Sequence, residues 1–554
     1  MNKCLIRSRN SKKQTTSGIT LVALVVTIVI LLILVGVTIY FIMSSGLIGK
    51  AEEAKRKSEE GTQNDLASLN NAEYELGKYL NNNFDRSKGV NTPEILTGMS
   101  KISFNSEKNV VKQGENGFDE NNWYNYENKE WANAMTQDGS MWVWIPRYAY
   151  KLDSSTQTAD VKFLVGTSNK WYDKTDGQVK DLPEGYIVHP CFENGSATGK
   201  NNNYENGEWD KDLTGIWVAK FEAAYPSGGN SAPVKASSVK YSQMIAYVAA
   251  VEAGTSSDTT TTARNWLDGE YAVKNSDGTY AWKNGQETAI KYPTFQGSSY
   301  SMNYININDA NNVSRAMTEE GNIYGFDGTA DSHLMKNSEW GAVTYLCKSQ
   351  YGLGSTNIHI NNVNLNNSTK SVYAVTGCSA NGENDGPTAS TVSNTWNTAA
   401  GQKASTTGNQ YGVYDMSGGT WERTASYVAN GNGNLKTYGK SVAYDGENLR
   451  TTSNKYYTAY TANDSGLTNY DEASKANYEA NKGRYGDAVR ETSTAGIGSS
   501  SWYGDYSNFP SYGTPFFLRG GSFWNGSSAG VCAFHRTGGT SNYDYGFRAV
   551  VVAQ

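Results

Sequence analysis

The sequence predicts an α+β domain with long loops, preceded by an N-terminal apolar helix. Apolar or alternating stretches at Met141–Tyr150, Gly215–Ala223 and Ala549–Ala553 are typical of β-strands. The chain also contains 57 glycines and 38 tyrosines, a composition that favours a loop-rich, surface-displayed domain over a helical cytosolic enzyme. Helices are expected at Ser242–Ala253, at Ser332–Ser349, with Ser332 as a candidate N-cap, and at Asp471–Lys482.

Length and charge narrow the class of protein. The 554 residues are 38% hydrophobic and 12% aromatic, which is enough for a large core. The formal net charge is −6, and no basic stripe interrupts the chain after the apolar helix, so we expect no nucleic-acid partner. No period of ~20–50 residues repeats, which argues against a solenoid or a propeller.

The N-terminus has the features of a membrane anchor. Basic residues precede Gly18, and Ile19–Met43 is almost entirely apolar and long enough to cross a bilayer as one helix. The basic flank predicts a single-pass protein of the bacterial cell membrane with an extracellular C-terminal domain. The Gly18-Ile19 junction resembles a type IV prepilin leader, residues 1–18, cleaved after Gly18, although Ala23 stands where pilins usually carry Glu. An uncleaved signal anchor is the alternative.

The stretch between the anchor and the C-terminal domain changes character twice. Residues 44–83 continue as a charged amphipathic helix that we interpret as a stalk, and residues 84–121 read as a polar linker. Residues 122–214 are rich in Trp and Tyr and predict a β region packed on the C-terminal domain. Trp142 and Trp144 could form a carbohydrate platform, but core packing is favoured because alternating residues on a strand usually pack inside.

Three short motifs carry a family resemblance. They are Y-G-V-Y-D-M-S-G-G-T-W-E (411–422), R-G-G-S (519–522) and G-F-R (546–548). In order and spacing they resemble the variable proteins of diversity-generating retroelements, which carry the C-type-lectin fold in the form shared with formylglycine-generating (sulfatase-modifying) enzymes. Lys336–Tyr345 lies where that family has its acidic-aromatic helix. Gly419 replaces the family's usual Asn, and the connection from Glu422 to Arg519 is longer than usual.

The resemblance implies a C-type-lectin-like, ligand-binding domain over residues 215–554. In this fold the first and last strands pair, so Gly215–Ala223 is expected beside Ala549–Ala553. The Arg-Gly-Gly (519–521) and Gly-Phe-Arg (546–548) motifs are expected to be scaffold, because paired glycines supply backbone angles that other residues reach only with strain. The insertion Ala425–Pro515 is expected to cover one side of the binding face.

Between the two glycine motifs lies Ser522–Tyr545, which has neither strand alternation nor a helical period. Its aromatic residues are spaced by Gly, Ser, Thr and Asn, which is the make-up of a paratope. In the resembled retroelements, template adenines are randomised and AAY codons become NNY, which cannot encode Met, Gln, Lys, Glu or Trp. Ser522–Tyr545 contains no Met, Gln, Lys or Glu, and Trp524 is the single residue in it that an NNY codon cannot encode. Tyr351–Thr369 also contains no Met, Gln, Lys or Glu, so this absence agrees with diversification without proving it.

The expected ligand-binding residues all lie in this segment. We expect Phe523, Trp524, His535, Arg536, Tyr543 and Tyr545 to be largely exposed. The full set is Ser522, Phe523, Trp524, Ser527, Ser528, Cys532, Phe534, His535, Arg536, Thr537, Thr540, Asn542, Tyr543, Asp544 and Tyr545.

Few residues have a pattern that would support catalysis. The cysteines after the apolar run show neither C-x-x-C nor zinc-like spacing; they are Cys191, Cys347, Cys378 and Cys532. The sequence is compatible both with a Cys347–Cys378 disulfide and with free thiols. Formylglycine-generating enzymes use a copper-binding cysteine pair after R-G-G-S, whereas Cys532 has no partner in the segment. Gly419 also lacks the side-chain oxygen that could serve calcium. We therefore expect no catalytic residue, no metal and no cofactor.

Three readings of the whole chain follow. The first is a cell-surface binding protein, receptor-like or adhesin-like, whose ligand is an unknown protein or glycan on another cell, a phage or a host surface. The second is a structural, minor pilin-like subunit with a fixed lectin-like head. The third is an oxidase of the formylglycine-generating type. A reverse transcriptase gene and an Asn-rich near copy of the segment in the genome would favour the first.

Overall fold

The computed structural model describes residues 25–35, 83–197, 203–224, 272–274, 276, 280–282, 292–366, 372–382, 388–389 and 394–554. The chain divides into two compact units, Met1–Glu75 and Leu76–Gln554. In the first unit, residues 25–35 form a helix. No helix in the described part of the chain is both long and apolar enough to cross a membrane. The predicted leader, both ends of the apolar run, residues 44–82 of the predicted stalk and the predicted helix Ser242–Ala253 lie outside the described residues.

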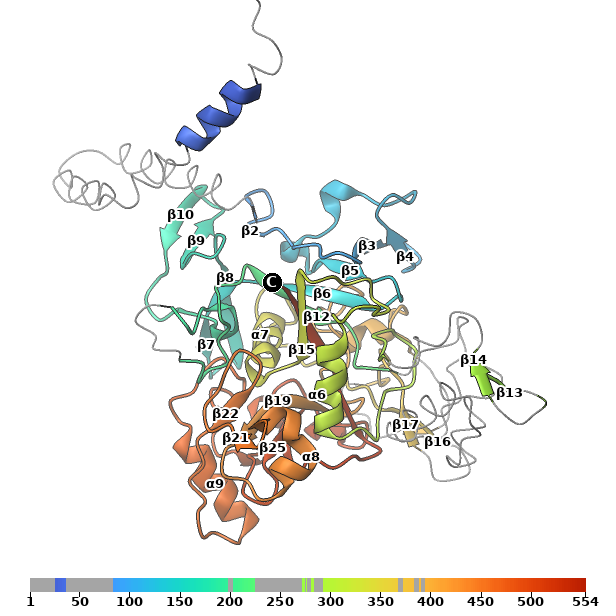
Figure 1. Ribbon diagram of the computed structural model, residues 1–554, viewed down its shortest axis with the longest axis vertical. Helices are drawn as coiled ribbons and strands as arrows, with labels where there is room; N and C mark the ends of the chain where they lie inside the picture. The colour runs from blue at the N-terminus through green and yellow to red at the C-terminus, as the bar shows by residue number, and fades with distance from the viewer. Residues whose placement is uncertain are drawn as a thin grey trace, which may run out of the picture. The chain divides into compact units, whose positions relative to one another are not determined.

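The second unit combines helices and sheets, and sheet predominates (Figure 1). Its central sheet has seven strands, and each neighbouring pair is antiparallel. In spatial order the strands are β15 (Ala330–Leu334), β28 (Ala549–Ala553), β12 (Gly215–Ala219), β6 (Met141–Pro146), β5 (Asn133–Met135), β3 (Ser100–Phe104) and β4 (Val110–Lys112).

The expected pairing of the Gly215 strand with the terminal strand is confirmed. Trp217 of β12 lies opposite Val551 of β28, and Val218 lies opposite Val550. On its other edge β12 pairs with β6 from the aromatic-rich region, so the boundary expected at Gly215 falls inside one continuous sheet. The stretch read as a linker contributes β3 and β4 to the same sheet.

A second sheet carries the motifs of the C-terminal region. Its strands in order are β22 (Thr458–Tyr460), β19 (Trp421–Val428), β25 (Phe516–Arg519), β26 (Phe534–Thr537), β24 (Ser507–Asn508) and β23 (Ile497–Gly498). A further strand, β27 (Tyr545–Phe547), pairs in parallel with β19. The W-E end of the first motif therefore lies beside both glycine motifs.

Among the described residues of the second unit there are four α-helices: α6 (Ile307–Ala316), α7 (Asn337–Cys347), α8 (Asn434–Ala443) and α9 (Tyr470–Ala480). Helix α6 packs on β15 and α8 (Figure 1). The helix predicted at Asp471–Lys482 is confirmed by α9. The predicted start of α7 at Ser332 is wrong, because Ser332 belongs to β15 and pairs with Val551, and Lys336 precedes the first helical turn.

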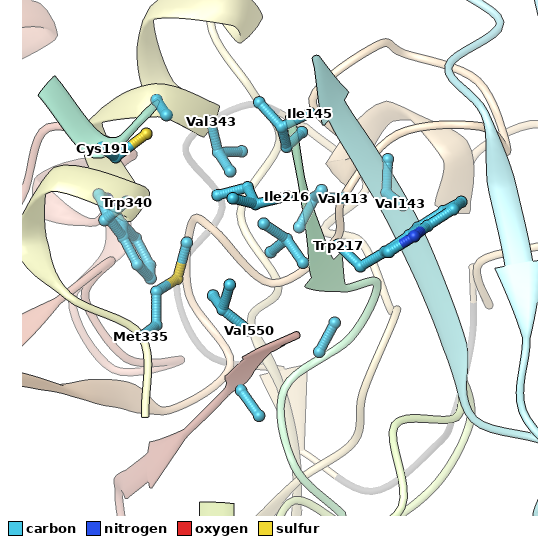
Figure 2. Packing of buried hydrophobic residues seen from close by; sticks show 14 of the residues in the cluster. Val143, Ile145, Cys191, Ile216, Trp217, Met335, Trp340, Val343, Val413 and Val550 are labelled. Carbon is cyan, nitrogen blue, oxygen red and sulfur yellow. The ribbon is translucent and has the colours of Figure 1, made fainter. Parts of the chain in front are cut away.

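Apolar side chains from the central sheet and α7 form one core (Figure 2). Val143, Ile216 and Val550 from three adjacent strands belong to the same cluster as Trp340 and Val343 of α7. Trp142 and Trp144 of β6 are also buried, which confirms core packing over a carbohydrate platform.

The remaining elements form smaller sheets and short turns. The strands are β1 (Phe84–Asp85), β2 (Val90–Asn91), β7 (Tyr148–Asp153), β8 (Thr158–Phe163), β9 (Lys170–Asp173), β10 (Gln178–Asp181), β11 (Ile187–Val188), β13 (Ala272–Lys274), β14 (Tyr280–Trp282), β16 (Val363–Asn366), β17 (Val372–Ala374), β18 (Thr388–Ala389), β20 (Tyr444–Asp445) and β21 (Asn448–Leu449). The 3-10 helices are η1 (Glu120–Asn122), η2 (Tyr126–Asn128), η3 (Pro190–Phe192), η5 (Gly401–Ala404), η6 (Trp502–Gly504) and η7 (Gly526–Ser528).

Candidate ligand-binding face

The C-terminal segment, residues 522–545, is held at its first end by Arg519. This side chain is fully buried at the end of β25. Its guanidinium donates to three backbone carbonyl oxygens, those of Ala533 at 3.0 Å, Asp487 at 2.8 Å and Ala488 at 2.9 Å. Gly520 and Gly521 follow with φ values of 86° and 80°, the left-handed region that suits glycine. The chain therefore leaves β25 in a fixed direction.

The second end of the segment is held by the G-F-R motif. Phe547 is fully buried, and Arg548 Nε donates to Glu422 Oε2 at 2.7 Å. Gly546 lies so close to Thr420 that an added Cβ would fall 2.2 Å from the hydroxyl oxygen. Together with Arg519, these contacts support the scaffold role that the sequence predicted for both motifs.

A buried acidic cluster underlies this end. Glu222, Asp415 and Glu422 are all fully buried, and Arg548 pairs with Glu422. The Glu222 carboxylate accepts from the Ser301 hydroxyl and from the backbone and hydroxyl of Thr420, at 3.1 Å for the backbone N–H. Burial, followed by the charge of Asp415, raises the pKa of Glu222. These carboxylates contact other buried groups of the protein and do not belong to the exposed surface.

Part of the segment faces inward, so the expectation that it is all surface is wrong. Five of the expected ligand-binding residues are buried: Ser522, Phe523, Cys532, Phe534 and Thr537. The N–H of Phe523 donates to the Gly419 carbonyl at 2.9 Å. The Phe534 side chain of β26 packs with Phe517 and Phe509 in a buried cluster. The N–H of Cys532 donates to the buried Asp505 carboxylate at 2.9 Å.

The other ten expected residues remain at the surface, and we name them the C-terminal face. Trp524 is 46% exposed, Ser527 and Thr540 are exposed as well, and the rest are half-buried. The half-buried members are Ser528, His535, Arg536, Asn542, Tyr543, Asp544 and Tyr545. The expectation that His535, Arg536, Tyr543 and Tyr545 are largely exposed is therefore wrong. Their role in binding stays a prediction.

The His535 side chain of β26 packs against two aromatic rings. Its ring centroid lies 5.3 Å from that of Trp421 and 5.3 Å from that of Tyr506. Burial lowers the pKa of His535 to about 4, and the charge of Arg536 acts in the same direction. The imidazole is therefore neutral at physiological pH and adds aromatic surface without charge.

Arg536 ties the segment to the insertion. Its guanidinium donates to the carbonyl of Tyr470 at 2.7 Å and to the hydroxyl of Ser474, both on α9. Asp471 lies 3.7 Å away, and the guanidinium carbon is 5.1 Å from the centroid of the Tyr470 ring. The insertion 425–515 therefore contacts the segment 522–545 through α9, and its expected role of covering one side of a binding face stays a prediction.

The last part of the face is organised around a buried cation. Arg423 donates through Nε to the Ile305 carbonyl at 3.0 Å and also to the carbonyl of Thr540, and it lies 5.3 Å from the Tyr545 ring centroid. Asp544 accepts from Ser522 Oγ at 3.4 Å, and burial raises the pKa of the Asp544 carboxyl to about 6. At neutral pH this end of the face therefore carries an ionised carboxylate.

Sequence reasoning missed several residues that frame the face. Tyr506 and Trp421 pack against His535, and Asn303 donates to the Tyr543 carbonyl at 2.6 Å. The backbone N–H of Tyr304 donates to the Asn542 carbonyl at 2.9 Å. These residues come from distant parts of the chain, and no periodicity marks them. Trp421 belongs to the first family motif and Tyr506 to the Tyr-rich insertion, whereas no sequence signal marked Asn303 or Tyr304.

The chain was compared with protein families, curated proteins and solved structures. No family model and no curated protein matches the chain. Among solved structures it is similar to Treponema denticola variable protein 1, at 13% sequence identity and a TM-score of 0.18, over 63% of this chain and 89% of that chain.

Proposed function

We propose that this chain is a ligand-binding, receptor-like protein of the bacterial cell surface and that the C-terminal face contacts the ligand. The observation that carries the proposal is Trp524, a large aromatic side chain that is 46% exposed on a segment fixed at both ends by buried arginines. Exposed Trp and Tyr on a rigid frame supply contact area at little entropic cost. Such residues dominate binding energy at protein interfaces.

We also propose that the segment is diversified and that the domain is of the C-type-lectin type. Support comes from the absence of Met, Gln, Lys and Glu between residues 522 and 545 and from the division of the segment into surface residues and buried residues. Diversification without loss of the fold requires that variation fall on the surface residues, because substitutions in a packed core usually destabilise a protein.

Sequencing the gene in many cells of one population tests this proposal. We expect substitutions at the codons of the C-terminal face other than that of Trp524, each traceable to an adenine in a nearby template copy. Phe523, Cys532 and Phe534 should stay constant or change only to residues of similar size. A locus without a template copy, or variation spread evenly over buried and exposed codons, would count against diversification.

Surface anchoring is a further part of the proposal. Its support is the apolar run that follows Gly18 and the basic residues before it. Mass spectrometry of the membrane-associated protein should find a mature N-terminus at Ile19. An N-terminus at Met1 would favour an uncleaved anchor, and protein free in the medium would reject anchoring.

The proposal assigns no catalysis to the domain. Cys532, the one cysteine near the place where the resembled oxidases carry their cysteine pair, is fully buried, and burial raises the pKa of its thiol. A nucleophile or copper ligand needs the thiolate, which this environment disfavours.

A further inference from the structure

A cavity of about 680 Å³ lies where the insertion meets the loop that contains Tyr204. It shares no residue with the C-terminal face. Its volume falls within the ~300–1,000 Å³ range of small-molecule sites. Its lining includes Tyr204, Glu205, Asn430, Thr452, Thr461 and Arg484.

The wall of this cavity is rich in hydrogen-bonding side chains. Thr451, Thr452 and Thr461 are exposed and present hydroxyl groups, each of which can both donate and accept. Tyr204 is half-buried and adds an aromatic ring. Small-molecule sites are usually lined mainly by apolar side chains, so this lining suits a ligand that is itself rich in hydroxyl groups.

Two buried groups in the wall leave hydrogen-bonding capacity unused. Arg484 donates to Asn481 Oδ1 at 3.0 Å and to the Ala459 carbonyl at 2.7 Å, but its Nη1 has no partner among the described residues. Asn430 Nδ2 donates to Asp464 at 2.9 Å, whereas its Oδ1 likewise has no described partner. Both atoms are shielded from solvent, so a bound molecule can pair with them only through a buried water.

The charges of the lining point to a neutral ligand. Arg484 and Glu205 are its charged residues, and their charges cancel. An acidic or basic ligand would therefore meet one repulsive partner for each attractive one. Neutral sugars carry many hydroxyl groups and also present an apolar ring face that packs on aromatic side chains such as Tyr204.

We propose that this cavity is a second binding site that accepts a neutral oligosaccharide. It is independent of the C-terminal face and of any diversification there. A surface protein with both sites would hold a glycan at a fixed pocket while the face contacts a separate ligand.

The test uses the full-length protein in detergent micelles and isothermal titration calorimetry. The neutral probes are maltotriose, cellotriose, mannotriose and chitotriose, and trigalacturonic acid is the charged probe. We expect saturable binding of at least one neutral trisaccharide. Thr452→Trp fills the cavity from an exposed position and should weaken that binding about tenfold or more.

Two controls separate this site from the rest of the molecule. Thr468→Trp changes an exposed threonine of the same insertion outside the cavity lining and should bind as wild type does. Trp524→Ala, on the C-terminal face, should also leave trisaccharide binding unchanged. The proposal is overturned if no neutral trisaccharide binds saturably, if Thr452→Trp binds as well as Thr468→Trp, or if trigalacturonic acid binds more tightly than every neutral probe.

Discussion

Arg548 and Glu422 form a fully buried ion pair although 126 positions separate them in the chain. Nε of Arg548 donates to Oε2 at 2.7 Å, and Nη2 donates to Oε1, so the contact is bidentate. Glu422 lies in β19 of the second sheet, and Arg548 immediately precedes β28 of the central sheet. The pair therefore fixes the point at which the chain passes from one sheet to the other.

The first prediction concerns this ion pair. Arg548→Met should lower the free energy of unfolding by ~3–5 kcal/mol, because Glu422 would remain buried beside Asp415 and Glu222 without its cation. Chemical denaturation of the full-length protein measures the loss. The double variant Glu422→Gln/Arg548→Met should recover part of it, and an Arg548→Met protein as stable as wild type would show that the pair contributes nothing.

The second prediction is a pH dependence that arises at Asp505. Burial raises the pKa of this carboxyl from 3.8 to about 7, while the N–H of Cys532 opposes that rise. The folded protein thus binds the proton more tightly than the unfolded chain, and the resulting stabilisation is present below about pH 4 and lost as the pH rises through 7.

Asp505→Asn removes this titration and keeps an oxygen for the Cys532 N–H. The stability of the variant relative to wild type should therefore rise by ~2–4 kcal/mol between pH 4 and pH 8. Denaturation curves collected at intervals across this range measure the difference. Curves that stay parallel for the two proteins would contradict the assignment.

The third prediction compares two neighbouring aromatic residues. Trp524→Ala should change stability by no more than about 0.5 kcal/mol, since the indole is exposed. Phe523→Ala, one position earlier and fully buried, should cost ~3–5 kcal/mol. Thermal unfolding measures both. Equal losses would mean that Trp524 belongs to the core, and the proposed contact role of the C-terminal face would lose its main support.

The fourth prediction compares two glycines with left-handed backbones. Gly521 has φ +80°, and an added Cβ would lie 2.6 Å from Ala529, whereas Gly526 has φ +51° and open space around it. Alanine at either position costs ~1–2 kcal/mol from the backbone alone. Gly521→Ala should lower the melting temperature further than Gly526→Ala, and a smaller effect would place Ala529 elsewhere.

The fifth prediction tests the alternative of oxidase activity. Full-length protein incubated with copper and a cysteine-containing sulfatase peptide should leave the peptide cysteine unchanged, because the thiol of Cys532 is buried and has no partner cysteine. The four cysteines that the structure describes are free and buried, so each should react with a maleimide only after denaturation. Formylglycine in the peptide would reverse this reading.

Apolar periodicity predicted the parts of the fold whose side chains face a single environment. The strand at β12, its partner β28 and the helix α9 all follow from such patterns. Strand β15 was not predicted, because three of its buried residues, Asp331, Ser332 and His333, are polar. Arg315 donates to Asp331, and His333 Nε2 lies 2.7 Å from Glu339 Oε1. Those partners come from flanking helices, and no local pattern in A-D-S-H-L signals them.

The segment 522–545 was located from its two framing motifs, but its inner and outer residues were not separated. Phe523 and Trp524 are adjacent and both aromatic, yet one is fully buried and the other is 46% exposed. The Phe523 N–H donates to the Gly419 carbonyl, a contact between distant parts of the chain that no local pattern signals. In a segment without periodicity, only the folded structure assigns side chains to a face.

The position of β28 between β15 and β12 has a consequence during protein synthesis. The central sheet lacks an inner strand until residues 549–553 have left the ribosome, so this sheet is completed only after the segment 522–545 has been translated. Any stop codon or frameshift introduced between residues 522 and 545 removes that strand. We therefore expect truncated products to remain unfolded and to be degraded, so that every folded copy carries an intact reading frame through the segment.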